Sequence, residues 1–148
     1  MKKTLSLVLA LVMTVSLFTF GPIVSASAAF TDSNSITYKE AVDVIYSLGI
    51  MSGYSDGMFH GEYPLNKAQI CAIMGRILMK TKKYRVPSNP ADVIRQHYDD
   101  TVAEYALNEV ALLLNLGILV DSSRTFNRGI SRIDVVEMLY RAFNKNFL

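Results

Sequence analysis

The chain has 148 residues, of which 51% are hydrophobic, and it carries a formal net charge of +2. Lys2 and Lys3 supply that excess, so the chain without its first 28 residues holds 13 basic and 13 acidic residues. Such a balance argues against a nucleic-acid partner, which calls for a basic face. The single cysteine, Cys71, cannot form an internal disulfide. The remaining length therefore predicts one small domain that is held together by its core alone.

Residues 1–28 show the three-part pattern of a secretory signal peptide. Lys2 and Lys3 precede an apolar stretch over residues 5–20, and Ala26-Ser27-Ala28 is a small-x-small cleavage site. The apolar stretch is short for a membrane span of about 20 residues. Cleavage is therefore favoured over an uncleaved anchor, which stays open. We expect a secreted chain that starts near residue 29 and has no stable membrane span.

Residues 29–80 predict two helices joined by a loop. Thr37 and Glu40 have the spacing of a capping box at the start of the first helix. Gly49 is expected to end that helix in the left-handed conformation. Asn66 is expected to cap the second helix, with Gln69 three residues later. The loop between the helices contains Asp56-Gly57, a turn signal. Apolar residues spaced for one helix face are expected to form core, namely Ala41, Val44, Ile45 and Leu48 in the first helix and Ile70, Ile73, Met74, Ile77 and Leu78 in the second.

Residues 98–148 repeat this pattern. Phe30-Thr31-Asp32 returns as Tyr98-Asp99-Asp100, and Gly49-Ile50 returns as Gly117-Ile118 at the same offset. After a shorter loop, Ser131 is expected to cap the last helix with Asp134 as a weaker partner. The predicted core stripes of this half are Ala106, Val110, Leu113 and Leu114, and then Val136, Leu139, Tyr140 and Phe143. Repeated units of this size bury their apolar faces against neighbouring copies.

Residues 81–97 are predicted to link the two repeats. Pro87 and Pro90 interrupt this segment. Asn89-Pro90 followed by Asp92 predicts the start of a short helix, with proline in its first turn. The expected fold class is therefore all-α, with two helix-loop-helix repeats, a short linking helix and hairpin-like loops.

These motifs together resemble the S-layer homology domain, a bacterial cell-wall anchoring module. That family shows Phe-x-Asp, an aromatic-Ala pair, a Gly-Ile-x-x-Gly-Tyr-x-Asp-Gly-Thr-Phe stretch and a Thr-Arg-Ala-Glu motif. The first repeat matches through Phe30-Thr31-Asp32, Gly49-Ile50, Gly53-Tyr54-Ser55-Asp56-Gly57-Met58-Phe59 and Asn66-Lys67-Ala68-Gln69. The second matches through Tyr98-Asp99-Asp100, Tyr105-Ala106, Gly117-Ile118, Thr125-Phe126 and Ser131-Arg132-Ile133-Asp134.

The resemblance implies binding of secondary cell-wall polysaccharide, whose sugars are often pyruvylated and anionic. A cation at the first turn of a helix suits such an anion, and Lys67 and Arg132 occupy that place. Tyr105 stands where the family has its aromatic residue. The candidate glycan-binding residues are Arg132, Lys67, Tyr105, Tyr54, Asp32 and Asp100.

Each candidate also has a structural interpretation, which for Arg132 is an exposed residue in the first turn of a helix. Asp32 and Asp100 would brace the following helix, Tyr54 would pack within its loop, and Tyr105 would lie half-buried in the core. For Lys67 the structural interpretation is favoured, because lysine in place of the usual arginine loses bidentate recognition of a carboxylate.

An enzyme is disfavoured. His60 and His97 are the only histidines, and no metal-ligand or nucleophile motif accompanies them. We therefore expect a non-catalytic chain without metal or cofactor. The resemblance implies a place at the cell wall of a bacterium with a Gram-positive-type envelope.

The second repeat lacks the Gly-Tyr-x-Asp-Gly loop, and only two repeats are visible where the family commonly has three. A second copy of the chain or another surface protein with such repeats is thus open as a partner. The alternative function is a degenerate repeat fold that mediates protein interaction or dimerisation without binding glycan.

Overall fold

The computed structural model describes residues 30–98, 101–119 and 125–146, and within these ranges it contains helices and no strands. This confirms the predicted all-α class. None of the helices in these ranges is long and apolar enough to cross a membrane. The predicted signal peptide lies outside the described residues. The elements in order are η1 (Ser33–Ser35), α2 (Lys39–Ser47), α3 (Lys67–Lys82), α4 (Pro90–Arg95), η2 (Glu104–Ala106), α5 (Leu107–Asn115) and α6 (Arg132–Asn146).

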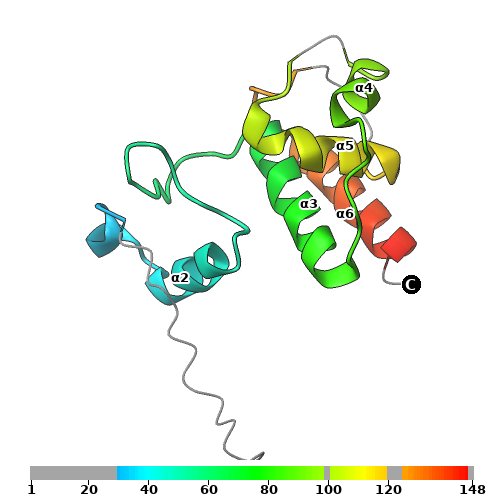
Figure 1. Ribbon diagram of the computed structural model, residues 1–148. Coiled ribbons are helices and arrows are strands. Elements are labelled where there is room, and N and C mark those ends of the chain that lie inside the picture. Colours follow the sequence, from blue (N-terminus) through cyan, green and yellow to red (C-terminus); the bar gives the residue numbers. More distant parts are fainter. Residues whose placement is uncertain (1–29, 99–100, 120–124, 147–148) are drawn as a thin grey trace, which may run out of the picture.

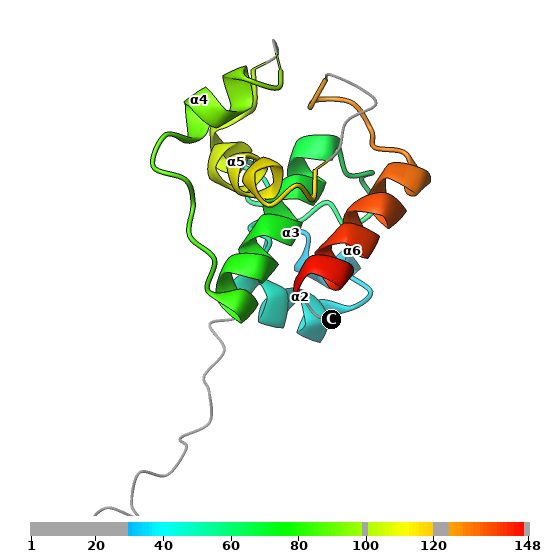
Figure 2. The ribbon, with the colours of Figure 1, turned by 90° about the vertical axis from the view of Figure 1, so that its right-hand side faces the viewer.

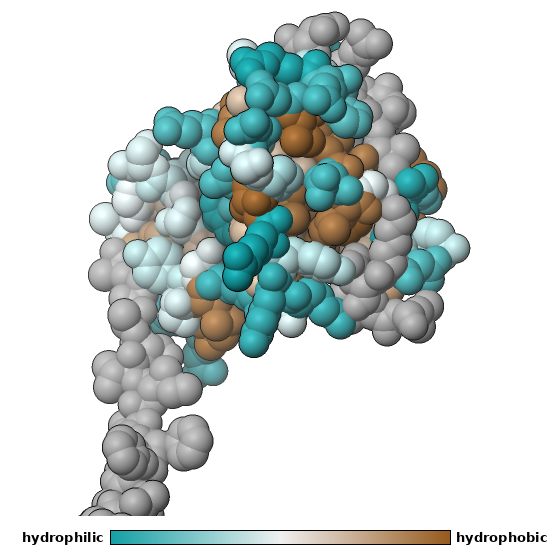
Figure 3. All heavy atoms as spheres, turned by 45° about the vertical axis from the view of Figure 1, so that its right-hand side comes forward, coloured by the Kyte–Doolittle hydropathy of each residue, from teal (hydrophilic) through white to brown (hydrophobic). Residues whose placement is uncertain are grey.

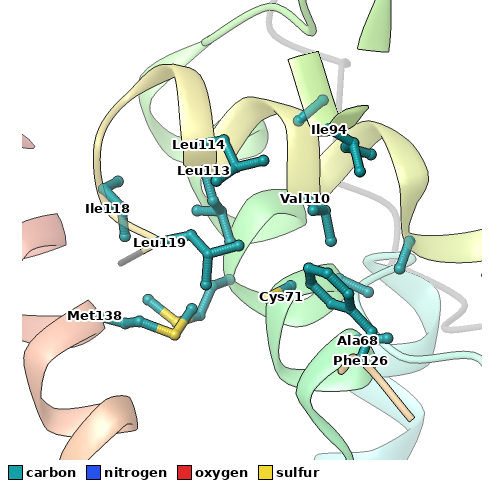
Figure 4. Packing of buried hydrophobic residues seen from close by; sticks show 14 of the residues in the cluster. Ala68, Cys71, Ile94, Val110, Leu113, Leu114, Ile118, Leu119, Phe126 and Met138 are labelled. Carbon is teal, nitrogen blue, oxygen red and sulfur yellow. The ribbon is translucent and has the colours of Figure 1, made fainter. Parts of the chain in front are cut away.

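The core lies between α3, α4, α5 and α6. Figure 1 shows these four helices gathered together, with α2 standing apart from them. Figure 2 shows α4 and α5 on one side of this bundle and α6 on the other. Val110 and Leu113 of α5 are fully buried. They point toward Cys71 of α3, Met138 of α6 and Phe126, which precedes α6 (Figure 4). Cys71 is thus a small buried apolar residue, as its place in the helix pattern indicates.

The first-helix prediction is partly wrong. The helix begins at Lys39 after Tyr38, and no side chain caps it, so the predicted capping box of Thr37 and Glu40 does not form. The predicted core face is also exposed, with Val44 at 49% and Leu48 at 46% exposure. The physical reason is the position of α2, which has no helix packed along that face in the described part of the chain (Figure 1).

Two helices end in the same way. The Gly49 N–H donates to the carbonyl three residues earlier at 2.7 Å, and the Ile50 N–H donates to the one five residues earlier at 3.1 Å. Gly117 and Ile118 close α5 with the equivalent bonds at 2.8 and 2.9 Å. Both glycines have a φ near +60° (+62° and +63°), as this Schellman geometry requires. The predicted glycine stops are confirmed.

The predicted caps of the second helices are confirmed. Asn66 accepts a hydrogen bond from the Gln69 N–H at 2.8 Å, and the Gln69 side chain accepts one from the Asn66 N–H at 2.9 Å. At α6 the Ser131 hydroxyl accepts from the Asp134 N–H at 3.2 Å and donates to the Asp134 carboxylate at 2.5 Å. The Ser131 hydroxyl thus caps α6 and also contacts the carboxylate three residues later.

The predicted core stripes of α3, α5 and α6 differ in how far they are buried. The α5 stripe is buried as predicted, and α3 buries Met74 and Leu78 while Ile77 is 37% exposed. The α6 stripe prediction is wrong, because α6 turns Met138 and Ala142 toward the core instead. The predicted core residues of α6 are instead exposed, namely Val136 (58%), Leu139 (41%), Tyr140 (61%) and Phe143 (54%). Apolar side chains reach the surface among hydrophilic ones on the face seen in Figure 3.

The predicted linking helix is present as α4. It begins at Pro90, with proline in the first turn and Asn89 before it. Ile94 is 4% exposed, since it packs into the shared core beside α5. The segment between the two predicted repeats is therefore part of the folded unit.

Candidate functional site

The first loop is the segment between α2 and α3, residues 48–66. Phe30-Thr31-Asp32 holds this loop in place. The Thr31 N–H donates to the Gly57 carbonyl at 3.0 Å. The Asp32 carboxylate accepts hydrogen bonds from the backbone N–H groups of Phe59 at 2.9 Å and His60 at 3.0 Å. Asp32 therefore braces the loop, whereas its structural interpretation from sequence was a brace for the following helix.

Gly53 allows the loop to pass directly over Phe30. A Cβ at this position would lie 2.5 Å from the Phe30 ring and 2.8 Å from the Met58 carbonyl oxygen, and its φ is +71°. The Tyr54 N–H donates to that same carbonyl at 2.9 Å, and the Asp56 carboxylate accepts from the Met58 N–H at 2.9 Å. The predicted turn at Asp56-Gly57 thus forms a tight loop with its own hydrogen bonds.

Two carboxylates of this loop region have lowered pKa values. The pKa of Asp32 is lowered mainly by the hydrogen bond from the Phe59 N–H. The pKa of Asp56 is lowered mainly by its hydrogen bond with the His60 ring, whose Nε2 lies 2.6 Å from the Asp56 oxygen. Such groups stabilise the fold above their unfolded-state pKa, and that stability is lost as pH falls through the folded-state value.

We expect Asp32→Asn to weaken the acid dependence of stability. In the wild type, stability should fall as the pH drops below the unfolded-state pKa of Asp32 and through its lowered folded-state value, because the carboxylate becomes protonated there. The amide cannot titrate, so the variant should be less stable than the wild type at pH 7, and this difference should shrink as the pH falls through that range. Thermal melting by circular dichroism across this range measures the difference. Parallel curves for the two proteins would contradict the assigned role of Asp32.

A pocket of about 470 Å³ lies between this loop, α3 and Tyr105. Aromatic rings form much of its wall. His60 stacks on Tyr63 with ring centroids 4.3 Å apart and planes 11° apart, and Tyr54 meets His60 edge-on at 5.0 Å. The lining includes Tyr54, Tyr63, Gln69, Arg76 and Tyr105.

Arg76 ties the walls of the pocket together. Its guanidinium donates to the Ile50 carbonyl at 3.0 Å, to the Tyr105 carbonyl at 3.1 Å and to the Glu109 carboxylate at 3.2 Å. These contacts join the residue after the C-terminal turn of α2, helix α3, and the η2–α5 segment. A guanidinium has five N–H groups, so two remain beyond these three bonds.

Tyr54 and Tyr105 each bring a hydroxyl group to the pocket. The Gln69 amide donates to the Tyr54 hydroxyl at 3.0 Å, which leaves the hydroxyl proton of Tyr54 for another acceptor. Tyr105 is 48% exposed, and burial of its hydroxyl raises the pKa while a hydrogen bond with Asn66 opposes the shift. Rings with one polar end and an exposed face suit the faces and hydroxyls of sugars.

The structure brings together two of the predicted site residues, Tyr54 and Tyr105. Lys67 lies elsewhere, 4% exposed, with its ammonium 5.0 Å from the Tyr98 ring centroid and 4.6 Å from that of Phe126. Arg132 is exposed in the first turn of α6 and does not line the pocket. Asp100 lies outside the described residues.

Sequence reasoning missed Arg76, Gln69 and Tyr63 as site residues. Gln69 was recognised only as a capping residue. Arg76 is the one charged residue within the apolar part of α3, and that position was the available signal. No cluster of metal-ligand side chains occurs within the residues that the structure describes.

Comparison with known proteins places the first loop and the start of α3 in a family. Residues 29–71 match the family model described as S-layer homology domain. No curated protein and no solved structure gives a significant match. S-layer homology domains are non-catalytic modules that anchor proteins to the cell wall by binding secondary cell-wall polymers. The match spans the Asp32-braced loop and the N-terminal turns of α3, including Tyr54 and Gln69. Residues 29–71 are therefore similar to an S-layer homology domain.

Proposed function

We propose that this chain binds an anionic, pyruvylated-type secondary cell-wall polysaccharide in the pocket between its first loop and Tyr105. The observation that carries the proposal is the combination in one pocket of three tyrosines with the Arg76 guanidinium. The exposed faces of Tyr63 (57%) and Tyr105 (48%) can lie against sugar rings. The two remaining N–H groups of Arg76 can donate to a carboxylate, in charge-assisted hydrogen bonds.

The proposed site uses residues from both halves of the chain, because Tyr105 comes from the half that follows residue 98. Several parallels support treating residues 98–148 as a second, degenerate repeat. The Tyr98 and Phe126 rings meet at 4.9 Å, as those of Phe30 and Phe59 meet at 5.4 Å. Arg141 donates to the Gly117 carbonyl at 3.3 Å, much as Arg76 reaches the equivalent end of its own first helix. We accordingly retain 29–80, 81–97 and 98–148 as the proposed division.

The remaining predicted residues have other places in this proposal. Asp32 holds the loop that forms one wall of the pocket and so supports the site without contacting the polymer. Lys67 contacts two aromatic rings of the second half, and Arg132 lies outside the pocket, so neither cation contacts polymer that is bound there. We further propose that residues 1–28 are removed on export and that the mature chain resides at a Gram-positive-type cell wall.

Co-sedimentation with cell-wall sacculi tests the proposal. The mature chain should pellet with native sacculi and remain in solution after the wall polysaccharide is chemically stripped. Tyr105→Ala should weaken binding about five- to tenfold, since an aromatic contact contributes about 1 kcal/mol. Tyr38→Ala is the matched control, because Tyr38 is 75% exposed and does not line the pocket.

Two results would overturn the proposal. One is a folded wild-type chain that stays in solution with native sacculi. The other is equal pelleting of the Tyr105 and Tyr38 variants, which would place the binding elsewhere. The first result would favour the second candidate function, a protein-interaction module, for which the exposed apolar face of α6 is the specific observation.

A further inference from the structure

Helix α6 presents an apolar stripe to solvent. Ile133 is 72% exposed, Val136 58%, Leu139 41% and Tyr140 61%. Their spacing places them along one face of the helix. Contiguous exposed apolar surface of this kind usually marks an interaction site.

The corresponding stripe of α3 is buried. When Asn66 and Ser131, the two helix caps, are aligned, each exposed residue of α6 falls on a buried residue of α3. The α3 residues in this alignment are Ala68, Cys71, Met74 and Gly75, for Ile133, Val136, Leu139 and Tyr140 respectively. All four are buried within the bundle, and α5 packs across this helix. Helix α6 thus exposes the face that α3 covers with a neighbouring helix.

The helix that corresponds to α5 is α2. Both end in a Gly-Ile Schellman turn, which fixes their alignment. Helix α2 has no buried residue, and Tyr38 (75% exposed), Val44 (49%) and Leu48 (46%) reach solvent. Figure 1 shows it apart from the other four helices. The α2 residues that correspond to Glu109, Val110 and Leu113 of α5 are Ala41, which is exposed, and Val42 and Ile45, which are half-buried. The chain therefore holds one helix of the α3 type with an exposed face and one of the α5 type whose equivalent face is at most half-buried.

Side-chain sizes at the point of closest approach are complementary between these two faces. In the α3–α5 pair, a Cβ added to Gly75 would lie 2.5 Å from the Glu109 Cβ, so a residue without a side chain faces a long one. The equivalent positions are Tyr140 on α6 and Ala41 on α2. The large residue is on α6 and the small residue is on α2. Because both of them carry a Cβ atom, α2 and α6 would pack further apart than α3 and α5 do.

The cation at the start of α3, Lys67, has an equivalent at the start of α6, Arg132. Lys67, at the start of α3, lies over the aromatic pair Tyr98 and Phe126. Its equivalent, Arg132, is exposed at the start of α6. A partner that supplies α2 also supplies the adjacent ring pair Phe30 and Phe59. A second copy of this chain thus brings a matching helix and a matching aromatic pair together.

We propose that the chain forms a closed dimer in which α2 of each copy packs on α6 of the other. The α6 stripe presents on the order of 500 Å² of apolar surface, whereas a stable interface buries about 800 Å² per partner. Adding the α2 face of the same copy reaches that area only if both contacts form, as two-fold symmetry provides. This inference does not rest on polymer binding.

Disulfide trapping between two different chains, each with one added cysteine besides the buried Cys71, tests the contact. Ala41→Cys in one chain and Tyr140→Cys in a chain of different mass should form a covalent heterodimer on mild oxidation, because these positions correspond to the point of closest approach between α3 and α5, and helices in contact there bring the two Cβ atoms within reach of a disulfide. Glu40→Cys with Tyr140→Cys is the matched control, since residue 40 is rotated by about 100° around α2. We expect at least about tenfold more heterodimer from the 41–140 pair.

Sedimentation velocity on the full mature chain completes the test. The wild type should sediment as two copies, and Tyr140→Asp should shift the population to one copy with an unchanged helical spectrum. Equal trapping at positions 40 and 41, or a wild type of single-copy mass at all concentrations, would overturn the proposal. A ladder of larger species from an Ala41→Cys/Tyr140→Cys chain would overturn the closed form.

Discussion

Replacing Phe126 with alanine should lower the free energy of unfolding by about 3–5 kcal/mol, the range for deleting a buried phenylalanine side chain. Phe126 has 0% exposure, and its ring meets that of Tyr98 edge-on at 4.9 Å. The ammonium of Lys67 also lies 4.6 Å from the ring centroid, so the deletion removes a cation–π contact as well. Chemical unfolding followed by circular dichroism measures this loss.

Two further variants separate the contributions at Phe126. Phe126→Leu keeps most of the apolar volume and removes the ring, so it should cost clearly less than the alanine change. Lys67→Met removes the charge and keeps the apolar stem, and a double-mutant cycle with Phe126→Leu should give a coupling of about 0.5–2 kcal/mol. A loss below about 1 kcal/mol for Phe126→Ala would contradict its placement in the core.

Gly75→Ala should destabilise the protein by about 1–3 kcal/mol, although the same change in an open helix stabilises by about 1 kcal/mol. The reason is the approach of α5, because the new Cβ would lie 2.5 Å from the Glu109 Cβ and 3.0 Å from its Cα. Backbone atoms cannot rotate away as a flexible side-chain end can, so α3 and α5 must separate. Thermal and chemical unfolding give both the sign and the size of the effect.

Gly129→Ala is the matched control for this change. An added Cβ at Gly129 meets no atom within 4 Å, so this variant should unfold within about 0.5 kcal/mol of the wild type. Gly75→Ala with wild-type or higher stability would show that the two helices are not in such close contact.

Features that depend on neighbouring residues were predicted well. The Asn66 cap, the left-handed Gly49 and the proline-started α4 each arise from backbone hydrogen bonds or φ preferences within a few residues. The missing cap at Thr37 shows the limit of such signals, because the helix begins one residue later than the pattern predicts, with Tyr38 at the cap position and no side-chain cap hydrogen bond.

The burial of α6 could not be read from spacing alone. This helix carries two apolar stripes, one with Met138 and Ala142 and another with Val136 and Tyr140. Periodicity identifies both, and only the position of α3 and α5 decides which of them faces the core. The stripe assigned to the core is the one that the monomer leaves in contact with solvent.

The candidate site was predicted in part for a similar reason. Tyr54 and Tyr105 were identified by their places in motifs, and the fold brings them to one pocket. Arg76 joins that pocket through three acceptors from separate segments, which no local pattern reveals. Lys67 occupied the expected cation position, yet the aromatic pair of the second half covers it.

The first turn of α3 is completed by a segment that is synthesised much later. Its Lys67 N–H donates to the Arg128 carbonyl at 3.0 Å, and its Ala68 N–H donates to the Phe126 carbonyl at 3.2 Å. Amides at a helix start have no acceptor within their own helix, so a nascent chain that ends before residue 126 leaves both of them to water. The family match ends at Cys71, inside α3. A boundary drawn by sequence similarity therefore cuts through the cooperative folding unit, which closes only when the last third of the chain has been delivered.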